Sequence, residues 1–330
     1  MTVYYRLDAA NLDMEIINNA GALLRRGELV AFPTETVYGL GADALNPEAV
    51  KRIFAAKGRR PDNPLIVHVS SIEQVEELVD GIPSEARLLM ERFWPGPLTL
   101  VMRALSRVPD EVRAGGETVG VRMPDHPVAR ALIQLVGPLA APSANLSGRP
   151  SPTTAKHVKK DLDGRIAAVL DAGAAGLGIE STVLQVTSKP FRIIRPGGIT
   201  REQLLSALPA DIGLEDSEVR ADRYPHYQTR AQVVVISGPG ELEELSHRYG
   251  GKGKSTGFVV HKPNGYRHIL DEVDKVYQLE GDPELAVRSL YEILRDVDRL
   301  NIDVLWFESY PEQGMGAVLM DRVRKAGRRE

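Results

Sequence analysis

The chain has 330 residues, a formal net charge of −4 and no cysteine. Without cysteine, disulfide bonds, thiolate metal sites and a thiol nucleophile are all excluded. A content of 43% hydrophobic and 26% charged residues is ordinary for a globular protein, and the length allows two domains. The small negative charge argues against a protein covered by nucleic acid, although a local basic groove is compatible with it.

The N-terminal residues do not resemble a targeting or membrane segment. Asp8, Asp13 and Glu15 stand where a secretory signal would have a basic region and an apolar core. No stretch approaches the about 18 uninterrupted apolar residues of a membrane span. We therefore expect a cytoplasmic protein that does not bind membranes.

The region from residue 1 to 208 alternates predicted helices and strands. Apolar spacing over 14–26 predicts an amphipathic helix, and an apolar strand follows over 28–32. Further helices are predicted over 49–56, 71–79, 84–93, 127–136, 152–160 and 201–208, and further strands over 65–69, 98–102, 119–122, 139–141, 169–172, 181–186 and 191–195. This mixture predicts one α/β domain with a twisted open sheet that is largely covered.

The remaining residues predict a linker and a second domain. Many charged residues between 209 and 230 leave little apolar surface to bury, which is typical of a linker. Strands are predicted over 232–236, 257–260, 275–279 and 303–307, and helices over 241–248, 283–298 and 316–325. This alternation over 231–330 predicts a small Rossmann-like α/β domain. Its Ser-Gly-Pro-Gly turn at 237–240 has neither a dinucleotide fingerprint nor a P-loop, so we interpret it as an ordinary strand-to-helix turn.

The run from Phe32 to Gly41 (FPTETVYGLG) is the most unusual stretch of the first domain. Pro33 cannot donate to a strand ladder, and Gly39 and Gly41 permit positive φ, so we expect the chain to turn here over a concave surface. Three hydroxyl groups and a carboxylate crowd into five residues of this run. An ordinary turn would also be polar, so this run alone does not assign a function.

Several other polar residues lie at or near the ends of predicted elements, where open α/β sheets gather their sites. A nucleoside triphosphate needs cations and oriented donors, and without a P-loop these must be side chains. Residues of the required types are Lys57, Arg59, Ser143, Asn145 and Arg195.

Two residues on predicted strands suit an amino-acid substrate. Arg122 lies on an apolar strand, and a buried guanidinium without an anionic partner is expensive, so it could hold a carboxylate. His68 is more ambiguous, because a histidine in a strand is more commonly a satisfied core residue.

Six motifs in order together resemble the YrdC-like threonylcarbamoyl-AMP synthases. They are PTETVYGLG at 33–41, the Lys57-x-Arg59 pair, NPLIVH at 63–68, WPGPLT at 94–99, VRMP at 121–124 and APSAN at 141–145. The resemblance extends over residues 10–207, and the part after residue 230 is similar to the extra domain of the two-domain members.

The resemblance implies an enzyme that makes L-threonylcarbamoyladenylate from L-threonine, bicarbonate and ATP with release of pyrophosphate. Mg²⁺ would accompany ATP, and other proteins would transfer the product to tRNA. The residues implied to bind ATP are Lys57, Arg59, Asn63, Thr118, Ser143, Asn145, Ser151, Arg195 and Tyr227, with Lys57 and Arg59 as the catalytic pair. The residues implied to bind L-threonine are Thr36, His68, Arg122 and Ser181.

Tyr227 closes a Tyr-Pro-His-Tyr segment in the predicted linker. Two-domain members have a similar motif, which the resemblance implies to fold over the nucleotide pocket. The chain departs from them at 219–221, where Val-Arg-Ala stands in place of a Ser-Pro-Gly turn. The alternative is a linker that packs on the second domain.

Two other functions remain open. An RNA-binding module would show salt-dependent RNA affinity without nucleotide turnover. A carbamoyl-transfer enzyme with a different acceptor would form an adenylate from carbamoyl phosphate rather than from threonine.

Overall fold

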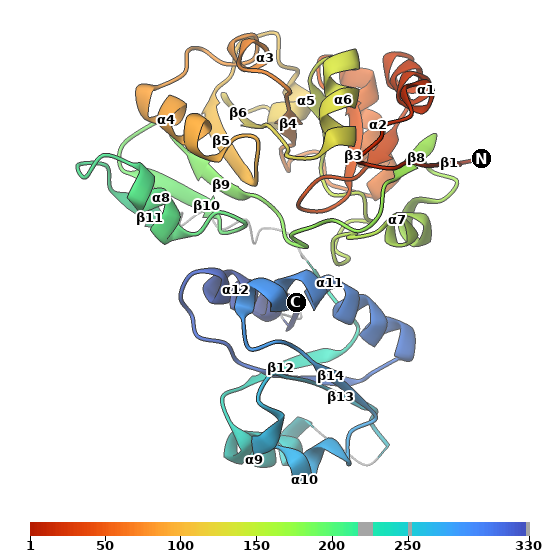
Figure 1. The fold of residues 1–330 in the computed structure, drawn as a ribbon, viewed down its shortest axis with the longest axis vertical. Coiled ribbons are helices and arrows are strands. Elements are labelled where there is room, and N and C mark those ends of the chain that lie inside the picture. The colour runs from red at the N-terminus through yellow and green to blue at the C-terminus, as the bar shows by residue number, and fades with distance from the viewer. Residues whose placement is uncertain (217–226, 250–252, 328–330) are drawn as a thin grey trace. The chain divides into compact units, whose positions relative to one another are not determined.

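A computed structural model describes residues 1–216, 227–249 and 253–327. The chain divides into two compact units, Met1–Ser147 with Ser151–Arg223 and Gly148–Pro150 with Tyr224–Glu330 (Figure 1). Two features of the sequence interpretation lie outside the described residues: the first three residues of the Tyr-Pro-His-Tyr segment and the departure at 219–221.

The described part of the first unit is built on a mixed sheet of 11 strands in the order β1-β8-β2-β3-β7-β4-β6-β5-β9-β10-β11. The strands are β1 Val3–Arg6, β2 Val30–Phe32, β3 Gly39–Asp43, β4 Ile66–His68, β5 Leu98–Arg103, β6 Thr118–Arg122, β7 Leu139–Ala140, β8 Ala168–Asp171, β9 Thr182–Gln185, β10 Phe191–Arg195 and β11 Leu214–Asp216. The helices are α1 Met14–Arg25, α2 Pro47–Lys57, α3 Ile72–Glu76, α4 Ser84–Phe93, α5 Asp110–Arg113, α6 Pro127–Val136, α7 Ala155–Leu162 and α8 Arg201–Ala207. The predicted α/β fold is confirmed.

Two apolar clusters lie on opposite faces of this sheet. Because side chains alternate along a strand, Val67 and Val121 point into the larger cluster, while Ile66 and Gly120 point to the other face. On that second face α1 and α6 pack over β2, β7 and β8. They do not extend over β4, β6 and β5, since Ile66 and Gly120 are only half-buried. A partly open stretch of sheet is therefore available on this face.

The two glycines of the PTETVYGLG run do not turn the chain, so this interpretation was wrong. Gly39 and Gly41 lie within β3, which pairs antiparallel with β2, and neither has a positive φ. The Phe32 ring of β2 packs across them, and a Cβ added to Gly41 would lie 2.6 Å from Phe32 Cε1. Glycine is needed here for close approach rather than for backbone conformation.

Several element boundaries differ from those predicted, and two of the differences have clear reasons. The helix predicted over 152–160 begins at Ala155, because the Thr154 hydroxyl accepts the backbone N–H of His157 and caps it. The predicted linker, 209–230, still belongs to the sheet at its start, where β11 pairs with β10. Ile212 and Leu214 are buried there. The many charged residues around them in the sequence hide this short apolar pattern.

The described part of the second unit has a parallel sheet in the order β12-β15-β13-β14. Helices α9 and α10 lie on one face of it and α11 and α12 on the other (Figure 1). This confirms the predicted Rossmann-like domain. The elements are β12 Gln232–Ile236, α9 Pro239–Tyr249, β13 Thr256–Val260, the 3₁₀ turn Pro263–Gly265, α10 Arg267–Leu270, β14 Lys275–Gln278, α11 Pro283–Leu300, β15 Val304–Glu308 and α12 Met315–Gly327.

No helix in residues 1–216, 227–249 or 253–327 combines the length and the apolar character that a membrane crossing requires.

The close approach at β3 yields a stability prediction. Gly41→Ala should lower the free energy of unfolding by about 1–3 kcal/mol, because the Phe32 ring must move. Gly39→Ala is the matched control, since its added Cβ would meet its nearest neighbours at 3.5 Å or more, an ordinary contact. Urea unfolding followed through Trp94 fluorescence, with Trp306→Phe removing the signal of the second unit, measures both. An equal cost for the two variants would contradict this explanation.

Candidate functional site

The end of α2 brings Lys57 to the APSAN loop. Gly58 adopts the left-handed conformation at φ 62° and ends the helix, so Lys57 is its last residue. The Lys57 Nζ donates to the backbone carbonyl of Ser143 and, at 2.6 Å, to that of Asn145. Three residues predicted for the ATP phosphates are thus brought together.

The Lys57 side chain is buried, with 3% of the residue's surface exposed. Burial lowers the pKa of its amine well below the usual range, and the nearby Arg59 charge lowers the pKa further, while Asp161 acts in the opposite direction. An anion arriving beside this amine would favour its protonated form.

Arg59 lies just beyond the helix end and holds the loop that leads into β4. Its guanidinium donates to the backbone carbonyls of Asn63, at 3.3 Å, and Pro64, at 3.0 Å. The structure therefore also brings the predicted residues Arg59 and Asn63 together.

His68 and Arg122 lie side by side at the ends of two neighbouring strands. Parallel pairing of β4 and β6 places His68 opposite Arg122. Burial, together with the Arg122 charge, lowers the pKa of the His68 imidazole from 6.5 to about 3, so this ring is neutral. A fixed cation and a neutral imidazole therefore adjoin each other at the edge of the open sheet face.

The buried Arg122 guanidinium has an internal anion, Glu35, in the loop between β2 and β3. Arg122 Nη2 lies 2.6 Å from Glu35 Oε1, and Arg122 Nε donates to the Gly96 carbonyl at 3.2 Å. The ion pair is close but poorly aligned, since neither Arg122 Nη2 nor the Glu35 oxygens make a hydrogen bond within the described residues. Both groups therefore keep hydrogen-bonding capacity.

Ser181 connects the two predicted sets of residues. Arg195, which was predicted for the phosphates, donates to the Ser181 carbonyl at 2.9 Å and to its hydroxyl at 3.1 Å. The Ser181 hydroxyl also lies 2.8 Å from that of Thr99 on β5. A predicted nucleotide residue and a predicted threonine residue thus meet directly.

Two more predicted residues are buried hydroxyls. Thr36 Oγ1 lies 2.7 Å from Thr34 Oγ1, which in turn donates to the Val37 carbonyl at 2.6 Å. Because a hydroxyl has one proton, Thr36 is the donor of this pair and retains acceptor lone pairs. Ser151 donates to Glu180 Oε1 at 2.6 Å, next to Ser181 in the chain.

Among the described residues of the first unit, Thr118 lies apart from the other predicted site residues. Thr118 begins β6, about 13 Å along the strand from Arg122, although period-two alternation puts both on the open face. Tyr227 belongs to the second unit, where its ring stacks on Tyr291 at 5.3 Å and Arg322 lies over it at 5.1 Å. Its contact with the nucleotide stays a prediction.

Sequence reasoning gave no role to Glu35, Thr99 or Glu180. Because a buried Arg122 needs an anionic partner, the sequence did contain a usable signal. The sequence interpretation took that partner to be the substrate carboxylate rather than a carboxylate of the chain. Glu35 was the available candidate, as the carboxylate of the PTETVYGLG run. Thr99 and Glu180 had no comparable signal, because their partners are distant in the sequence.

Mg²⁺ has no protein cage in the described residues, where no three His, Cys, Asp or Glu side chains gather as a metal-binding group. In nucleotide enzymes this ion commonly keeps several waters and binds through the substrate phosphates. We therefore treat Mg²⁺ as part of the ATP substrate and derive no step from it.

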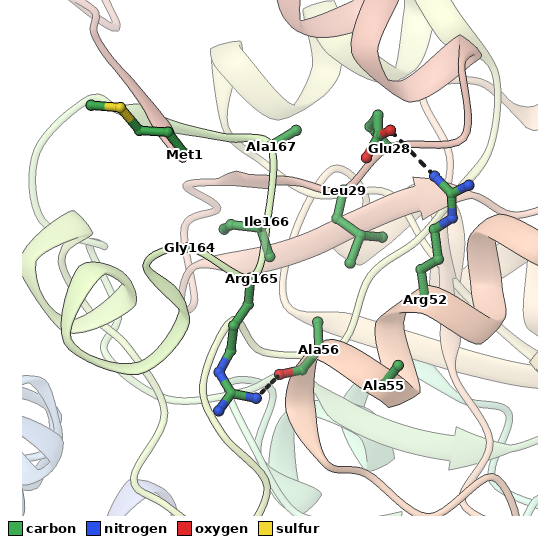
Figure 2. A pocket seen from close by; sticks show the side chains of 10 residues that line it. All are labelled: Met1, Glu28, Leu29, Arg52, Ala55, Ala56, Gly164, Arg165, Ile166 and Ala167. Carbon is green, nitrogen blue, oxygen red and sulfur yellow. Dashed lines mark hydrogen bonds and ion pairs between the residues drawn. The ribbon is translucent and has the colours of Figure 1, made fainter.

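A pocket of about 600 Å³ lies elsewhere in the first unit (Figure 2). None of the predicted site residues lines it. Its two arginines already have partners: Arg52 pairs with Glu28 at 3.4 Å, and Arg165 donates to the Ala56 carbonyl at 3.4 Å. We assign this pocket no function.

Comparison with known families defines the class of protein. The Sua5/YciO/YrdC family model, described as "Telomere recombination", matches residues 22–197. A second model, described as "Threonylcarbamoyl-AMP synthase, C-terminal domain", matches residues 199–327. The chain thus belongs to the Sua5/YciO/YrdC class and also has the C-terminal domain that the second model describes.

Individual relatives narrow this class. Threonylcarbamoyl-AMP synthase of Pyrococcus abyssi is 44% identical over 324 residues, covering 94% of this chain and 93% of the relative. The protein of the same name from Bacillus subtilis is 45% identical over 320 residues, covering 94% and 92%. The crystal structure of P. abyssi Sua5 complexed with L-threonine matches with a TM-score of 0.89 and 41% identity, covering 99% of this chain and 97% of that one. The chain belongs to the threonylcarbamoyl-AMP synthase family of enzymes, which confirms the resemblance.

The neutral state of His68 yields a pH prediction. Between pH 6.5 and about 3 the unfolded chain binds a proton at His68 that the folded protein excludes, so stability falls as pH falls. From pH 7 to pH 5, the wild type should lose about 1–2 kcal/mol more than His68→Gln. Urea unfolding of both proteins in the Trp306→Phe background measures the difference. Parallel losses would show that His68 is protonated in the folded state.

Proposed function

We propose that the chain makes L-threonylcarbamoyladenylate from L-threonine, bicarbonate and ATP with release of pyrophosphate, for threonylcarbamoyladenosine modification of tRNA. The observation that carries this proposal is the buried Arg122 guanidinium beside neutral His68, at the edge of the open sheet face. A fixed cation suits the threonine carboxylate. The P. abyssi Sua5 structure, which is described as a complex with L-threonine, supports the same substrate.

The threonine side chain would meet small polar groups in a buried setting. Thr36, His68 and Ser181 are all buried. Their side chains can donate hydrogen bonds to, or accept them from, a hydroxyl and an amine. Carbamates hydrolyse readily, so the proposed site would have to keep water from the carbamate once the substrates are bound.

The ATP phosphates would lie against Lys57 and Arg59, with Arg195 between them and threonine. The low pKa of Lys57 supports this proposal, because the phosphate charge would offset the burial that disfavours its ammonium form. Further nucleotide contacts are assigned to Asn63, Thr118, Ser143, Asn145 and Ser151.

The reaction would need no protein nucleophile. The threonine amine and bicarbonate give a carbamate, whose oxygen attacks the α-phosphorus of ATP and displaces pyrophosphate. Catalysis would come from holding the carbamate near the phosphorus and from neutralising the developing charge with Lys57, Arg59 and Arg195. Other proteins would then transfer the threonylcarbamoyl group to tRNA.

This proposal predicts strict substrate dependence. Pyrophosphate should appear only when L-threonine and bicarbonate are both present with ATP. L-Serine should be poorer by about 1–3 kcal/mol in transition-state free energy, because it lacks one methyl group. Pyrophosphate release with each component omitted in turn is the measurement. Equal turnover without threonine would refute the assignment, and adenylate formation from carbamoyl phosphate would favour carbamoyl transfer instead.

A second prediction separates the two parts of the site. Lys57→Ala or Arg59→Ala should raise the barrier to turnover by about 3 kcal/mol, because each removes charge stabilisation at the phosphates. Arg122→Ala should instead weaken threonine binding and leave ATP affinity nearly intact. Titration calorimetry with ATP and with threonine distinguishes these effects.

Arg60→Ala is the matched control for Arg59→Ala. Arg60 is the next residue along the chain, its side chain is 72% exposed, and it pairs with Asp62 at 3.2 Å. It should behave like the wild type in both titrations. If Arg122→Ala abolished ATP binding and spared threonine, the division of the site would be wrong.

A further inference from the structure

Glu35, Arg122 and His68 form a cluster of buried polar groups with unused hydrogen-bonding capacity. Within the described residues, Glu35 Oε2 and His68 Nδ1 lack a hydrogen-bond partner, and the 2.6 Å ion pair of Glu35 Oε1 with Arg122 Nη2 does not have hydrogen-bond geometry. Buried polar atoms are costly to leave unsatisfied. These atoms in neighbouring side chains indicate that a polar ligand completes the cluster.

The position of Glu35 is fixed by its backbone. Its carbonyl accepts the Leu177 N–H at 2.7 Å, and the Thr36 carbonyl accepts the Gly178 N–H at 3.1 Å. On the other side, the Thr34 hydroxyl accepts the N–H groups of Thr36 and Val37, both at 3.2 Å. The Glu35 side chain is only 17% exposed, so it is not a mobile surface carboxylate.

The two charges of this cluster match an amino-acid zwitterion. Arg122 offers a cation for the substrate carboxylate, and Glu35 offers an anion within 2.6 Å of that cation. A bound α-amino acid would place its carboxylate against Arg122 and its ammonium against Glu35, so that each charge faces its opposite. No other acidic side chain makes an ion pair with Arg122 among the residues that the structure describes.

We propose that Glu35 is a catalytic residue that binds the α-ammonium group of L-threonine and accepts its proton. This inference rests on the proposed function and adds the step that it leaves open. An ammonium group has no lone pair, so it must lose a proton before it can form a carbamate. Glu35 is the carboxylate next to the fixed cation that would hold the same substrate molecule.

The proton and electron balance of the step is simple. The ammonium transfers one proton to the Glu35 carboxylate and becomes an amine. The amine lone pair forms an N–C bond to bicarbonate, a C–O bond breaks, and one water leaves, which gives the carbamate. Glu35 then returns its proton to solvent.

A competing explanation is that Glu35 only holds Arg122 in position. The two roles differ in their effect on a ligand without an ammonium group. 2,3-Dihydroxybutanoate keeps the carboxylate and the side-chain hydroxyl of threonine but carries a hydroxyl in place of the amine. If Glu35 only positioned Arg122, Glu35→Gln would weaken this acid and threonine equally.

The experiment compares Glu35→Gln with wild type and with Glu28→Gln. Glu28 precedes β2, as Glu35 follows it, and its side chain is 47% exposed, so it is a matched control. For each protein we would measure the KM for threonine, the kcat for pyrophosphate release and the inhibition constant of 2,3-dihydroxybutanoate. ATP affinity, measured by calorimetry, tests whether the variant is folded.

Glu35→Gln should raise the KM for threonine about 10-fold or more, because a charge-assisted contact is lost. It should also lower kcat by about 10²-fold or more, the usual effect of removing a general base. The inhibition constant of the acid and the ATP affinity should change less than about 2-fold. Glu35→Asp keeps the charge and should restore part of the threonine affinity, and it serves as the test variant if Glu35→Gln does not bind ATP.

If Glu35→Gln weakened the binding of threonine and of 2,3-dihydroxybutanoate equally, the proposed role of Glu35 would be wrong. A fully active Glu35→Gln enzyme would also overturn that role, and in both cases the proposed function would stand. A wild type that released no pyrophosphate with threonine and bicarbonate would overturn the proposed function. In that case, calorimetry of threonine against the acid still tests whether Glu35 binds the ammonium.

Discussion

The buried charge of Arg122 is the constraint on which the site depends. A guanidinium taken out of water needs an anion and hydrogen-bond acceptors, and the chain supplies both from distant segments. Glu35 comes from the loop after β2, and the Gly96 carbonyl comes from the WPGPLT run. A Cβ on Gly96 would collide with the Phe93 carbonyl, so only glycine lets the chain present this acceptor here.

The sheet provides the rigid frame for this arrangement. Arg122 ends β6, His68 ends β4 beside it, and Thr99 is the second residue of the antiparallel neighbour β5. α1 and α6 cover only the other part of this face, and the side chains at these strand ends are buried but polar. The same sheet that builds the apolar core thus also holds a buried polar cluster.

Many of the helices and strands, and the family, could be predicted from the sequence, because they have strong local patterns. Helix 84–93 and strand 191–195 have the same limits in the structure, and the ordered motifs gave the family. Strand β3 was missed because Gly39 and Gly41 resemble a turn, whereas their reason is the Phe32 ring on the neighbouring strand. Glu35 was missed as the partner of Arg122 because sequence alone does not show which distant carboxylate a buried cation meets. Both failures involve contacts between segments, which local patterns do not encode.

Two basic side chains connect parts of the proposed site. Buried Lys57 contacts the APSAN loop, and half-buried Arg195 contacts Ser181, so a residue proposed for the phosphates touches one proposed for threonine. In such a site a carbamate formed on threonine need not travel to reach ATP, which favours reaction over hydrolysis.

A crystal structure of the chain with L-threonine bound tests the central claim most directly. Our account predicts the threonine carboxylate within hydrogen-bond distance of the Arg122 guanidinium and the ammonium within hydrogen-bond distance of Glu35. Threonine bound away from Arg122, or bound there with its ammonium facing away from Glu35, would contradict it.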